Sequence, residues 1–403
     1  MKKLEKSVPI IRFKGFYEAW EQRKLEDIAN YRNGKAHEQV EDEDGKYTII
    51  NSKFISTNGK VQRYTNEQVE PIFDGEIAMV LSDLPNGKAL AKLFLVKEDG
   101  KYTLNQRIAG ITPNENIDPI FLNFRMNRNN YFLKFDSGVT QTNLSKSQVE
   151  NFIALYPTFD EQYKIGLFFT QLDDAIALHQ RKLDALKLMK KGLLQQMFPN
   201  NEEKVPRLRF ADFNEKWERC KISSFARNTY GGGTPKTNVP EYWQGRIPWI
   251  QSGDLLIDSL FNIIPKKHVT GSAVKSSATK CIPANSIAIV TRVGVGKLAF
   301  IPFEYTTSQD FLSLSNLRVD SNFGTYSIYI MLQRELNTIQ GSTIKGITKS
   351  DLLEKNINKP LNRIEQERIG VSLKLLDNII TRYQSKLEKL SSLKKAYLQR
   401  MFI

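Results

Sequence analysis

Two stretches of the chain decide its architecture, because the second repeats the first at an offset of 204 positions. The first runs from Glu161 to Phe198 and reads EQYKIGLFFTQLDDAIALHQRKLDALKLMKKGLLQQMF. The second runs from Glu365 to Phe402 and reads EQERIGVSLKLLDNIITRYQSKLEKLSSLKKAYLQRMF. The two align without gaps, so a duplication within the chain is the simplest explanation.

Both stretches carry apolar residues at alternating spacings of four and three, which is the seam of a coiled coil. Pro157 and Pro360 lie just before the stretches, where proline is tolerated. A lone helix would leave such a seam in water, so we expect the two helices to pack on each other. Lys190 and Lys394 interrupt the seam, and we expect their charged ends to reach the surface. The predicted helix–helix contacts are Ile165, Phe169, Leu172, Ile176, Leu183 and Leu186 in the first helix, and Ile369, Leu373, Leu376, Ile380, Leu387 and Leu390 in the second.

A second repeat precedes the helices. Residues 9–25 return as residues 206–222, so that Arg12 and Trp20 recur as Arg209 and Trp217. The chain therefore has the order A-B-A′-B′. We predict mixed α/β domains at residues 1–157 and 201–360, followed by helices at 158–200 and 361–403.

Four strand-like runs support the α/β class, at residues 47–50, 77–81, 287–291 and 311–314. Faint echoes link the two domains further. They pair Ile77–Val80 with Ile287–Val290, Asn86-Gly-Lys88 with Val295-Gly-Lys297, and Gln106 with Gln309.

Composition narrows the class of protein. The chain has 403 residues, with 58 Lys and Arg against 44 Asp and Glu, a formal charge of +14. Two cysteines exclude a disulfide framework and favour a reducing compartment, and no signal peptide or membrane span is evident, so we expect a cytoplasmic protein. Residues 201–403 carry +12 of the excess, with 30 basic and 18 acidic side chains. Such a charge indicates a polyanionic partner, although ordinary globular proteins are also often basic.

No catalytic constellation is evident. The Asp/Asn-Pro-Pro-aromatic motif of amino-methyltransferases is missing, and the three histidines lie in unrelated contexts that do not suggest a metal site. Gly294-Val-Gly296-Lys297 lacks the remainder of a phosphate-binding loop, so we interpret it as a tight turn between strands. We expect this chain to bind no cofactor and no metal.

What remains is binding by polar and basic loops, the residue types that contact phosphates and base edges. An exposed turn would carry the same residues, so the pattern alone leaves both interpretations open. The candidate DNA-contacting residues are Lys53, Lys88, Gln106 and Arg107 in the first domain, and Thr234, Lys236, Ser252, Asp254, Arg292, Lys297, Ser308 and Gln309 in the second.

The chain resembles the specificity (S) subunit of type I restriction-modification enzymes over nearly its whole length. The most specific elements are Gly232-Gly-Thr-Pro235, Pro240-Glu-Tyr-Trp243 and Ile247-Pro-Trp249, followed by Gly346-Ile-Thr-Lys-Ser350 and the second helix. The first copy has Asn143-Leu-Ser-Lys-Ser147 and the first helix. It departs from the Gly-Gly-Thr-Pro pattern, with Tyr31-Arg-Asn-Gly-Lys35 in its place.

The resemblance implies a non-catalytic subunit whose two mixed α/β target recognition domains each read half of a split, asymmetric target in double-stranded DNA. The helices would pair as an antiparallel coiled coil and dock two adenine-N6 methyltransferase subunits, with restriction subunits joining them. S-adenosylmethionine, ATP and magnesium are implied for those partners only. A helix of 38 residues is about 57 Å long, so we predict that removing one heptad from one helix would shorten the gap in the target by up to about three base pairs. Two alternatives stay open: a scaffold that does not read sequence, and a DNA-modifying enzyme in its own right.

Overall fold

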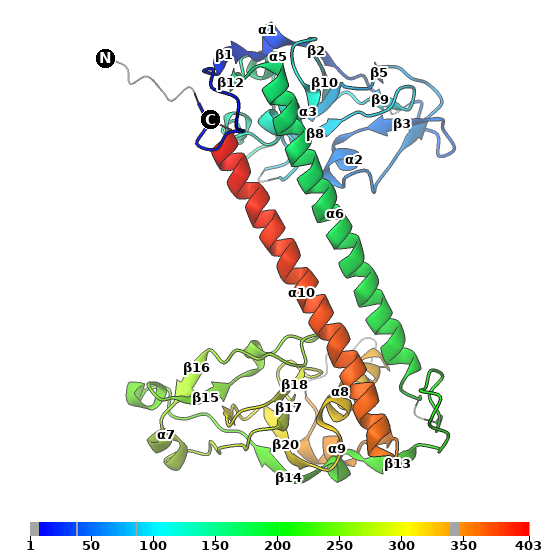
Figure 1. Cartoon of the computed structure of the whole chain (residues 1–403), viewed down its shortest axis with the longest axis vertical. Helices are drawn as coiled ribbons and strands as arrows, with labels where there is room; N and C mark the ends of the chain where they lie inside the picture. The colour runs from blue at the N-terminus through cyan, green and yellow to red at the C-terminus, as the bar shows by residue number, and fades with distance from the viewer. Residues whose placement is uncertain (1–7, 38, 86, 201, 339–345, 403) are drawn as a thin grey trace. The chain divides into compact units, whose positions relative to one another are not determined.

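The computed structural model describes residues 8–37, 39–85, 87–200, 202–338 and 346–402. Its contacts divide the chain into unit 1, which is Met1–Gln180 with Ser385–Ile403, and unit 2, which is Arg181–Gln384. Each unit contains part of both long helices, α6 (Phe159–Gln196) and α10 (Arg363–Met401) (Figure 1). Across the described residues, we find no helix that combines the length and the apolar character of a membrane span.

Unit 1 is built around a four-stranded antiparallel sheet in the order β2-β10-β6-β8. A second sheet, β4-β3-β9-β5, contains the parallel pair β3 and β9. The remaining strands form the pairs β1-β12 and β11-β7. The elements are β1 (Glu21–Lys24), α1 (Leu25–Ile28), β2 (Ala29–Asn33), β3 (Tyr47–Ile50), α2 (Ser52–Ser56), β4 (Tyr64–Thr65), β5 (Pro71–Ile72), β6 (Ile77–Val80), β7 (Ser82–Asp83), β8 (Leu93–Leu95), β9 (Tyr102–Leu104), β10 (Ile108–Pro113), α3 (Pro119–Met126), α4 (Asn130–Leu133), β11 (Thr142–Asn143), α5 (Lys146–Glu150) and β12 (Ile153–Tyr156).

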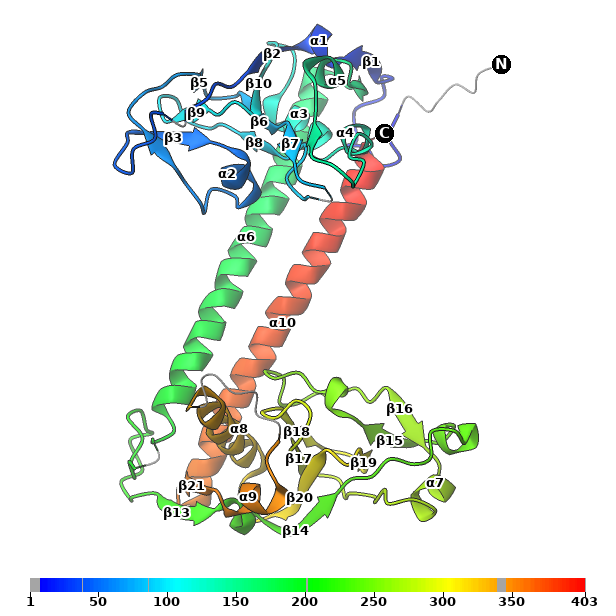
Figure 2. The same ribbon diagram turned by 180° about the vertical axis from the view of Figure 1, so that it is seen from behind.

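Unit 2 repeats this plan with the antiparallel sheet β14-β20-β17-β18 and the smaller sheet β16-β15-β19, in which β15 and β19 run parallel. Figure 2 shows α7, β15 and β16 on the side of this unit away from α10. The elements are β13 (Glu218–Lys221), η1 (Ile222–Phe225), β14 (Ala226–Gly231), η2 (Pro240–Trp243), β15 (Ile247–Ile250), η3 (Ser252–Asp254), β16 (Lys267–Val269), α7 (Gly271–Lys275), β17 (Ser286–Val290), β18 (Leu298–Ile301), β19 (Thr306–Thr307), β20 (Phe311–Leu317), α8 (Ser321–Thr338), α9 (Lys349–Glu354) and β21 (Asn356–Lys359).

The four strand-like runs of the sequence are confirmed as β3, β6, β17 and β20. β6 and β17 are inner strands of their sheets, and every one of their residues is buried. A strand buried on both faces needs apolar residues in succession rather than alternation, which explains why these runs stood out in the sequence.

The two long helices pack antiparallel in each unit. In unit 1, Lys394 of α10 donates to Asp173 of α6 over 2.5 Å. In unit 2, Lys190 of α6 donates to Asp377 of α10 over 2.6 Å. The repeat makes Lys190 equivalent to Lys394 and Asp173 equivalent to Asp377, so the two helices pair in the same register in both units.

The expectation that the seam lysines reach the surface is wrong for Lys190, whose side chain is 12% exposed, against 25% for Lys394. Lys190 is half-buried because an acidic partner faces it across the seam, which a single-helix pattern does not reveal. The predicted apolar contacts are all buried or half-buried, and Phe169 and Leu373 are fully enclosed.

The carboxyl end of each helix enters the core of the domain that the helix does not follow in the sequence. Met401 belongs to the core of unit 1, where the ring of Phe402 packs against Phe121. In unit 2, Met197 and Phe198 are part of the core, and the ring of Phe198 stacks on Phe323. Both domains are thus completed by a helix from the other half of the chain.

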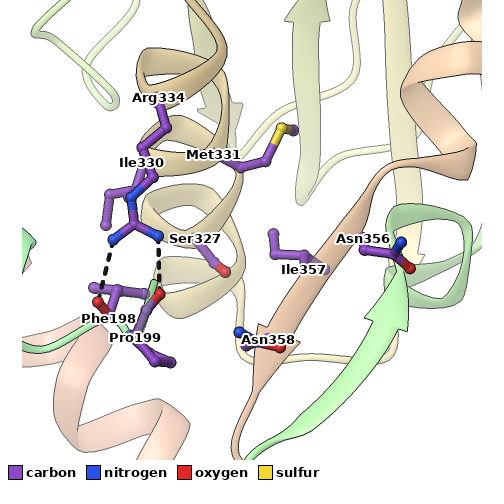
Figure 3. A pocket seen from close by; sticks show the side chains of 9 residues that line it. All are labelled: Phe198, Pro199, Ser327, Ile330, Met331, Arg334, Asn356, Ile357 and Asn358. Carbon is purple, nitrogen blue, oxygen red and sulfur yellow. Dashed lines mark hydrogen bonds between the residues drawn. The ribbon is translucent and has the colours of Figure 1, made fainter. Parts of the chain in front are cut away.

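Arg334 of α8 fixes the end of α6. Its guanidinium donates to the carbonyl oxygens of Pro199 and Phe198 over 2.8 and 3.2 Å (Figure 3). Burial lowers the pKa of Arg334, and a cation at a helix carboxyl end is favourably placed. The cavity beside it has a volume of about 20 Å³, room for one water molecule, so it is a structural joint rather than a ligand site.

The amino end of each helix is fixed by a repeated ion pair. Arg12 makes two hydrogen bonds of 2.7 Å to Glu161 at the start of α6. Arg209 makes the same contact with Glu365 at the start of α10, over 2.7 and 2.9 Å. Such bidentate pairs fix direction as well as position, so each helix leaves its own domain in a defined direction.

Candidate nucleic-acid interface

Five loops of unit 2 meet at one end of the sheet β14-β20-β17-β18. They follow β14, β15 and β17, and precede β20 and α9. Backbone hydrogen bonds join them: Gly233 donates to Thr307, Ser308 to Ile250, and Ile347 to Thr291. Residues from five distant parts of the sequence therefore form one surface.

The same five loops meet in unit 1. Lys35 donates to the carbonyl of Leu104, Asn105 to Ile50, and Leu144 to Leu81. These bonds correspond one for one to those of unit 2. The two halves share a loop-bearing scaffold even where their sequences have diverged.

A close backbone approach explains one residue of the divergent Gly-Gly-Thr-Pro region. A Cβ atom on Gly232 would lie 1.9 Å from the carbonyl oxygen of Ser308, and one on Gly34 would lie 2.1 Å from that of Asn105. Only glycine fits at either place. Gly34 of the Tyr31–Lys35 segment is therefore the counterpart of Gly232, a correspondence that the sequence alone did not establish.

Strand register tests the echoes between the domains. Ile108 pairs with Val80 as Phe311 pairs with Val290, which makes Gln106 and Gln309 equivalent. The echo between Lys88 and Lys297 is wrong, because register aligns Lys297 with Lys92. The cause is the longer loop between β6 and β8, which shifts the apparent match; Asn86 of that echo lies outside the described residues.

In unit 2 the structure brings several predicted residues together. The hydroxyl of Thr234 donates to Gln309 over 2.7 Å, and both side chains are exposed. The ammonium of Lys297 donates to the carbonyl oxygen of Ser252 over 3.2 Å, so it ties two loops together. Lys92, which register aligns with Lys297, donates to the carbonyl oxygen of Ser56 in unit 1, also over 3.2 Å.

Other predicted residues of unit 2 have structural roles or stand alone. Ser308 is 5% exposed and its hydroxyl donates to Asp310, so the prediction that it contacts a base does not fit its position. Asp254 accepts from the backbone of Gln251 and stabilises η3. Lys236 and Arg292 are exposed on their loops.

In unit 1, the predicted residues all lie on the surface. Lys53 is exposed on α2, and Lys88 is exposed on the loop after β7. Gln106 and Arg107 are exposed on the turn between β9 and β10, at the loop end of the sheet. Gln106 and Arg107 lie in the loop that precedes β10, which is the counterpart of the loop before β20 in unit 2.

Two basic residues of unit 1, Arg32 on β2 and Lys35 on the loop after it, are paired with acids. Arg32 makes two hydrogen bonds of 2.6 Å to Glu76, and Lys35 lies 3.1 Å from Glu70. Burial works against the ionisation of Glu76, but hydrogen bonds from Arg32 and Thr112 leave its pKa lowered overall. These pairs neutralise the charges of Arg32 and Lys35.

Within the described residues, no group of three His, Cys, Asp or Glu side chains could hold a metal ion. Unit 2 has an open recess of about 510 Å³ between the β14–β15 and β16 segments. There Lys267 lies 5.5 Å from the ring centre of Trp243. The recess is shallow and carries no arrangement of acid, base and nucleophile.

Comparison with known proteins places these features in a family. The family model described as "Type I restriction modification DNA specificity domain" matches residues 17–188 and 214–391. The chain is 22% identical over 401 residues to a putative type I restriction enzyme MjaX specificity subunit of Methanocaldococcus jannaschii, covering 94% of this chain and 91% of that protein. It is 35% identical over 164 residues to the EcoR124I/EcoR124II specificity subunit of Escherichia coli, covering 37% and 38%.

Two solved structures have the same fold. One is a type I restriction-modification S subunit from M. genitalium, with a TM-score of 0.65 at 12% identity, covering 98% of this chain and 99% of that one. The other comes from work on complex assembly and conformational transition of a type I system, with a TM-score of 0.55 at 17% identity and coverage of 96% and 98%.

Proposed function

Because the chain belongs to the family of type I restriction-modification specificity subunits, which recognise DNA and are not themselves catalytic, we propose that its two loop clusters each read one half of a split DNA target. The observation that carries this proposal is the equivalence of the two clusters. The same five loops meet in both units, while their exposed side chains differ. One scaffold with different side chains reads different sequences, so the target is asymmetric.

The long helices set the distance between the two half-sites in this proposal. α6 and α10 are continuous over 38 and 39 residues, and ion pairs hold them in one register in both units. A helix rises about 1.5 Å per residue, so the number of residues in the pair determines the length of the gap.

The outer faces of the helices support the docking of two methyltransferase subunits. Leu167 of α6 and Val371 of α10 are equivalent in the repeat, and each is 41% exposed. Tyr163 extends the first apolar stripe, while Leu375 and Ile379 extend the second at a spacing of four residues. Two similar apolar stripes, one in each unit, suit two copies of one partner.

The chemistry belongs to those partners. We assign adenine-N6 methylation with S-adenosylmethionine to the two methyltransferase subunits, and ATP- and magnesium-dependent cleavage to restriction subunits that join them. This chain contributes positioning: it binds the duplex and holds each methyltransferase over one half-site.

Methylome sequencing of cells with and without this chain tests the proposal. We expect N6-methyladenine in a motif of two different half-sequences separated by unspecified bases, which disappears when the chain is deleted. A palindromic motif, or methylation that does not depend on the chain, would refute it.

The two alternatives give other outcomes. A scaffold that does not read sequence would protect no particular sequence in a footprint on random duplexes. A DNA-modifying enzyme would form methylated or cut product when the purified chain alone is incubated with S-adenosylmethionine and DNA, where we expect none.

A further inference from the structure

A lysine of the loop cluster in unit 2 lies against a glycine. A Cβ atom on Gly231 would be 2.5 Å from the ammonium nitrogen of Lys349, the first residue of α9. Because Gly231 has no side chain, the ammonium group of Lys349 can lie against the backbone at the end of β14. Lys349 is half-buried there, among the loops of the candidate interface.

The equivalent lysine in unit 1 has a different environment. Lys146 is the first residue of α5, and it lies 3.5 Å from Glu150, four residues later. In unit 2 the position of that glutamate is taken by Leu353, which packs on the core. The acid partner is thus lost in one half of the chain only.

Two more cations surround Lys349. The backbone of Ile347 donates to Thr291, which places the neighbouring Arg292 beside the α9 loop. Thr279 donates to the carbonyl oxygen of Gly233 over 2.8 Å and so brings Lys280 to the same glycine loop. Desolvation, and then repulsion from Arg292 and Lys280, lowers the pKa of Lys349.

In the described part of the chain, no acid is paired with these cations. Among the described residues, Lys280, Arg292 and Lys349 form no ion pair within 4.0 Å. In unit 1, register places Ser82 at the position of Arg292. Three converging cations without a counter-ion favour an anion bound from outside, and the phosphate group is the anion that a DNA-reading surface meets.

We propose that Lys280, Arg292 and Lys349 form a phosphate-binding cluster that grips the DNA backbone at the half-site read by unit 2, a contact that unit 1 lacks. The inference rests on the proposed function. The cluster would account for part of the larger positive charge of the second half of the chain. Unit 2 would hold its half-site through contacts to the DNA backbone, and unit 1 would depend more on contacts to bases.

Salt dependence of binding measures the contact. The complex of this chain with its methyltransferase subunits is titrated with a duplex bearing the motif found in the methylome, from about 50 to 200 mM NaCl. We expect Lys349→Gln to lower the slope of log affinity against log salt by about one, and to weaken binding roughly fivefold near 0.15 M, equally for cognate and random duplexes. The matched control Lys146→Gln leaves the slope unchanged.

A second variant keeps the charge and moves it. Gly231→Ala places a methyl group where the ammonium of Lys349 lies, and we expect it to lower the slope in the same direction as Lys349→Gln. Duplexes in which one phosphate is replaced by an uncharged methylphosphonate locate the contact. At one linkage of this half-site, we expect the replacement to weaken DNA binding by the wild type but not to weaken binding by Lys349→Gln any further.

Three outcomes would overturn the inference: an unchanged slope in Lys349→Gln, an effect confined to the cognate sequence, or an equal effect of Lys146→Gln. Competition by millimolar inorganic phosphate that removes the difference between wild type and variant would assign the cluster to free phosphate instead. Failure of the proposed function is a separate result, because it appears in the wild-type complex as the absence of a split motif.

Discussion

The ion pair between Lys190 and Asp377 should stabilise unit 2 far more than its repeat, Lys394 with Asp173, stabilises unit 1. Lys190 and Asp377 are 12% and 17% exposed, and the hydroxyl of Tyr326 donates to Asp377 over 2.6 Å. In the unit 1 pair, the side chains are 25% and 42% exposed. The counterpart of Tyr326 in unit 1 is Phe124, which lies beside Lys394 as Tyr326 lies beside Lys190 and which has no hydroxyl to donate.

We expect Lys190→Met to cost about 2–3 kcal/mol, just below the range for breaking a fully buried pair, because it leaves the Asp377 carboxylate without its cation. Lys394→Met should cost about 0–1 kcal/mol, because water can solvate Asp173. Urea unfolding of the purified chain, followed by circular dichroism, measures both. Adding Asp377→Asn to Lys190→Met should recover part of the loss, since the amide oxygen still accepts from Tyr326. Equal costs for the two lysine variants would refute the assignment of burial as the cause.

Three further outcomes are expected. Gln309→Ala should relax base preference at one half-site by about 1–3 kcal/mol, and Gln106→Ala should do so at the other, as read from methylomes; equal loss on all sequences would assign either residue to the backbone. Removing one heptad from α6 and the facing heptad from α10 keeps the ion pairs in register and should shorten the gap by about three base pairs; an unchanged gap would contradict the spacer role. A fragment of residues 8–200 should form a symmetric dimer, because Phe198 of one copy can take the place of Phe402 in the other; a monomer at micromolar concentration in light scattering would exclude this.

The helices could be predicted from the sequence because a heptad seam and a gapless repeat are local signals. The same holds for β6 and β17, whose apolar runs follow from burial on both faces. The antiparallel direction was implied by the resemblance to the family. In the structure, ion pairs from Asp173 and Asp377 to lysines of the opposite helix stabilise this arrangement.

The candidate site was predictable only in part. Gln106 and Gln309 were correctly matched, because both directly precede a strand whose register is fixed by its neighbours. Lys88 was matched wrongly, since loop length shifts a sequence echo but not a strand ladder. Ser308 has the right chemistry for a base contact, but the backbone turns its hydroxyl inward to Asp310.

Lys280 and Lys349 were missed as a pair, although Lys349 recurs as Lys146 in a repeated motif. The signal that could have found them was the change from Glu150 to Leu353, which removes one acid from one half of the repeat. This change indicates an unpaired cluster of cations only when it is known that Lys280 and Arg292 lie beside Lys349.

The sequence by itself determined the duplicated order of the chain, the helical seam and the excess of positive charge in residues 201–403. These properties depend on periodicity and composition, which are local or additive along the chain. Only the tertiary structure decided which loops meet, which lysines keep an acid partner, and which core each helix end completes. Those relations join residues distant in sequence, and packing and backbone hydrogen bonds, rather than local pattern, bring them together.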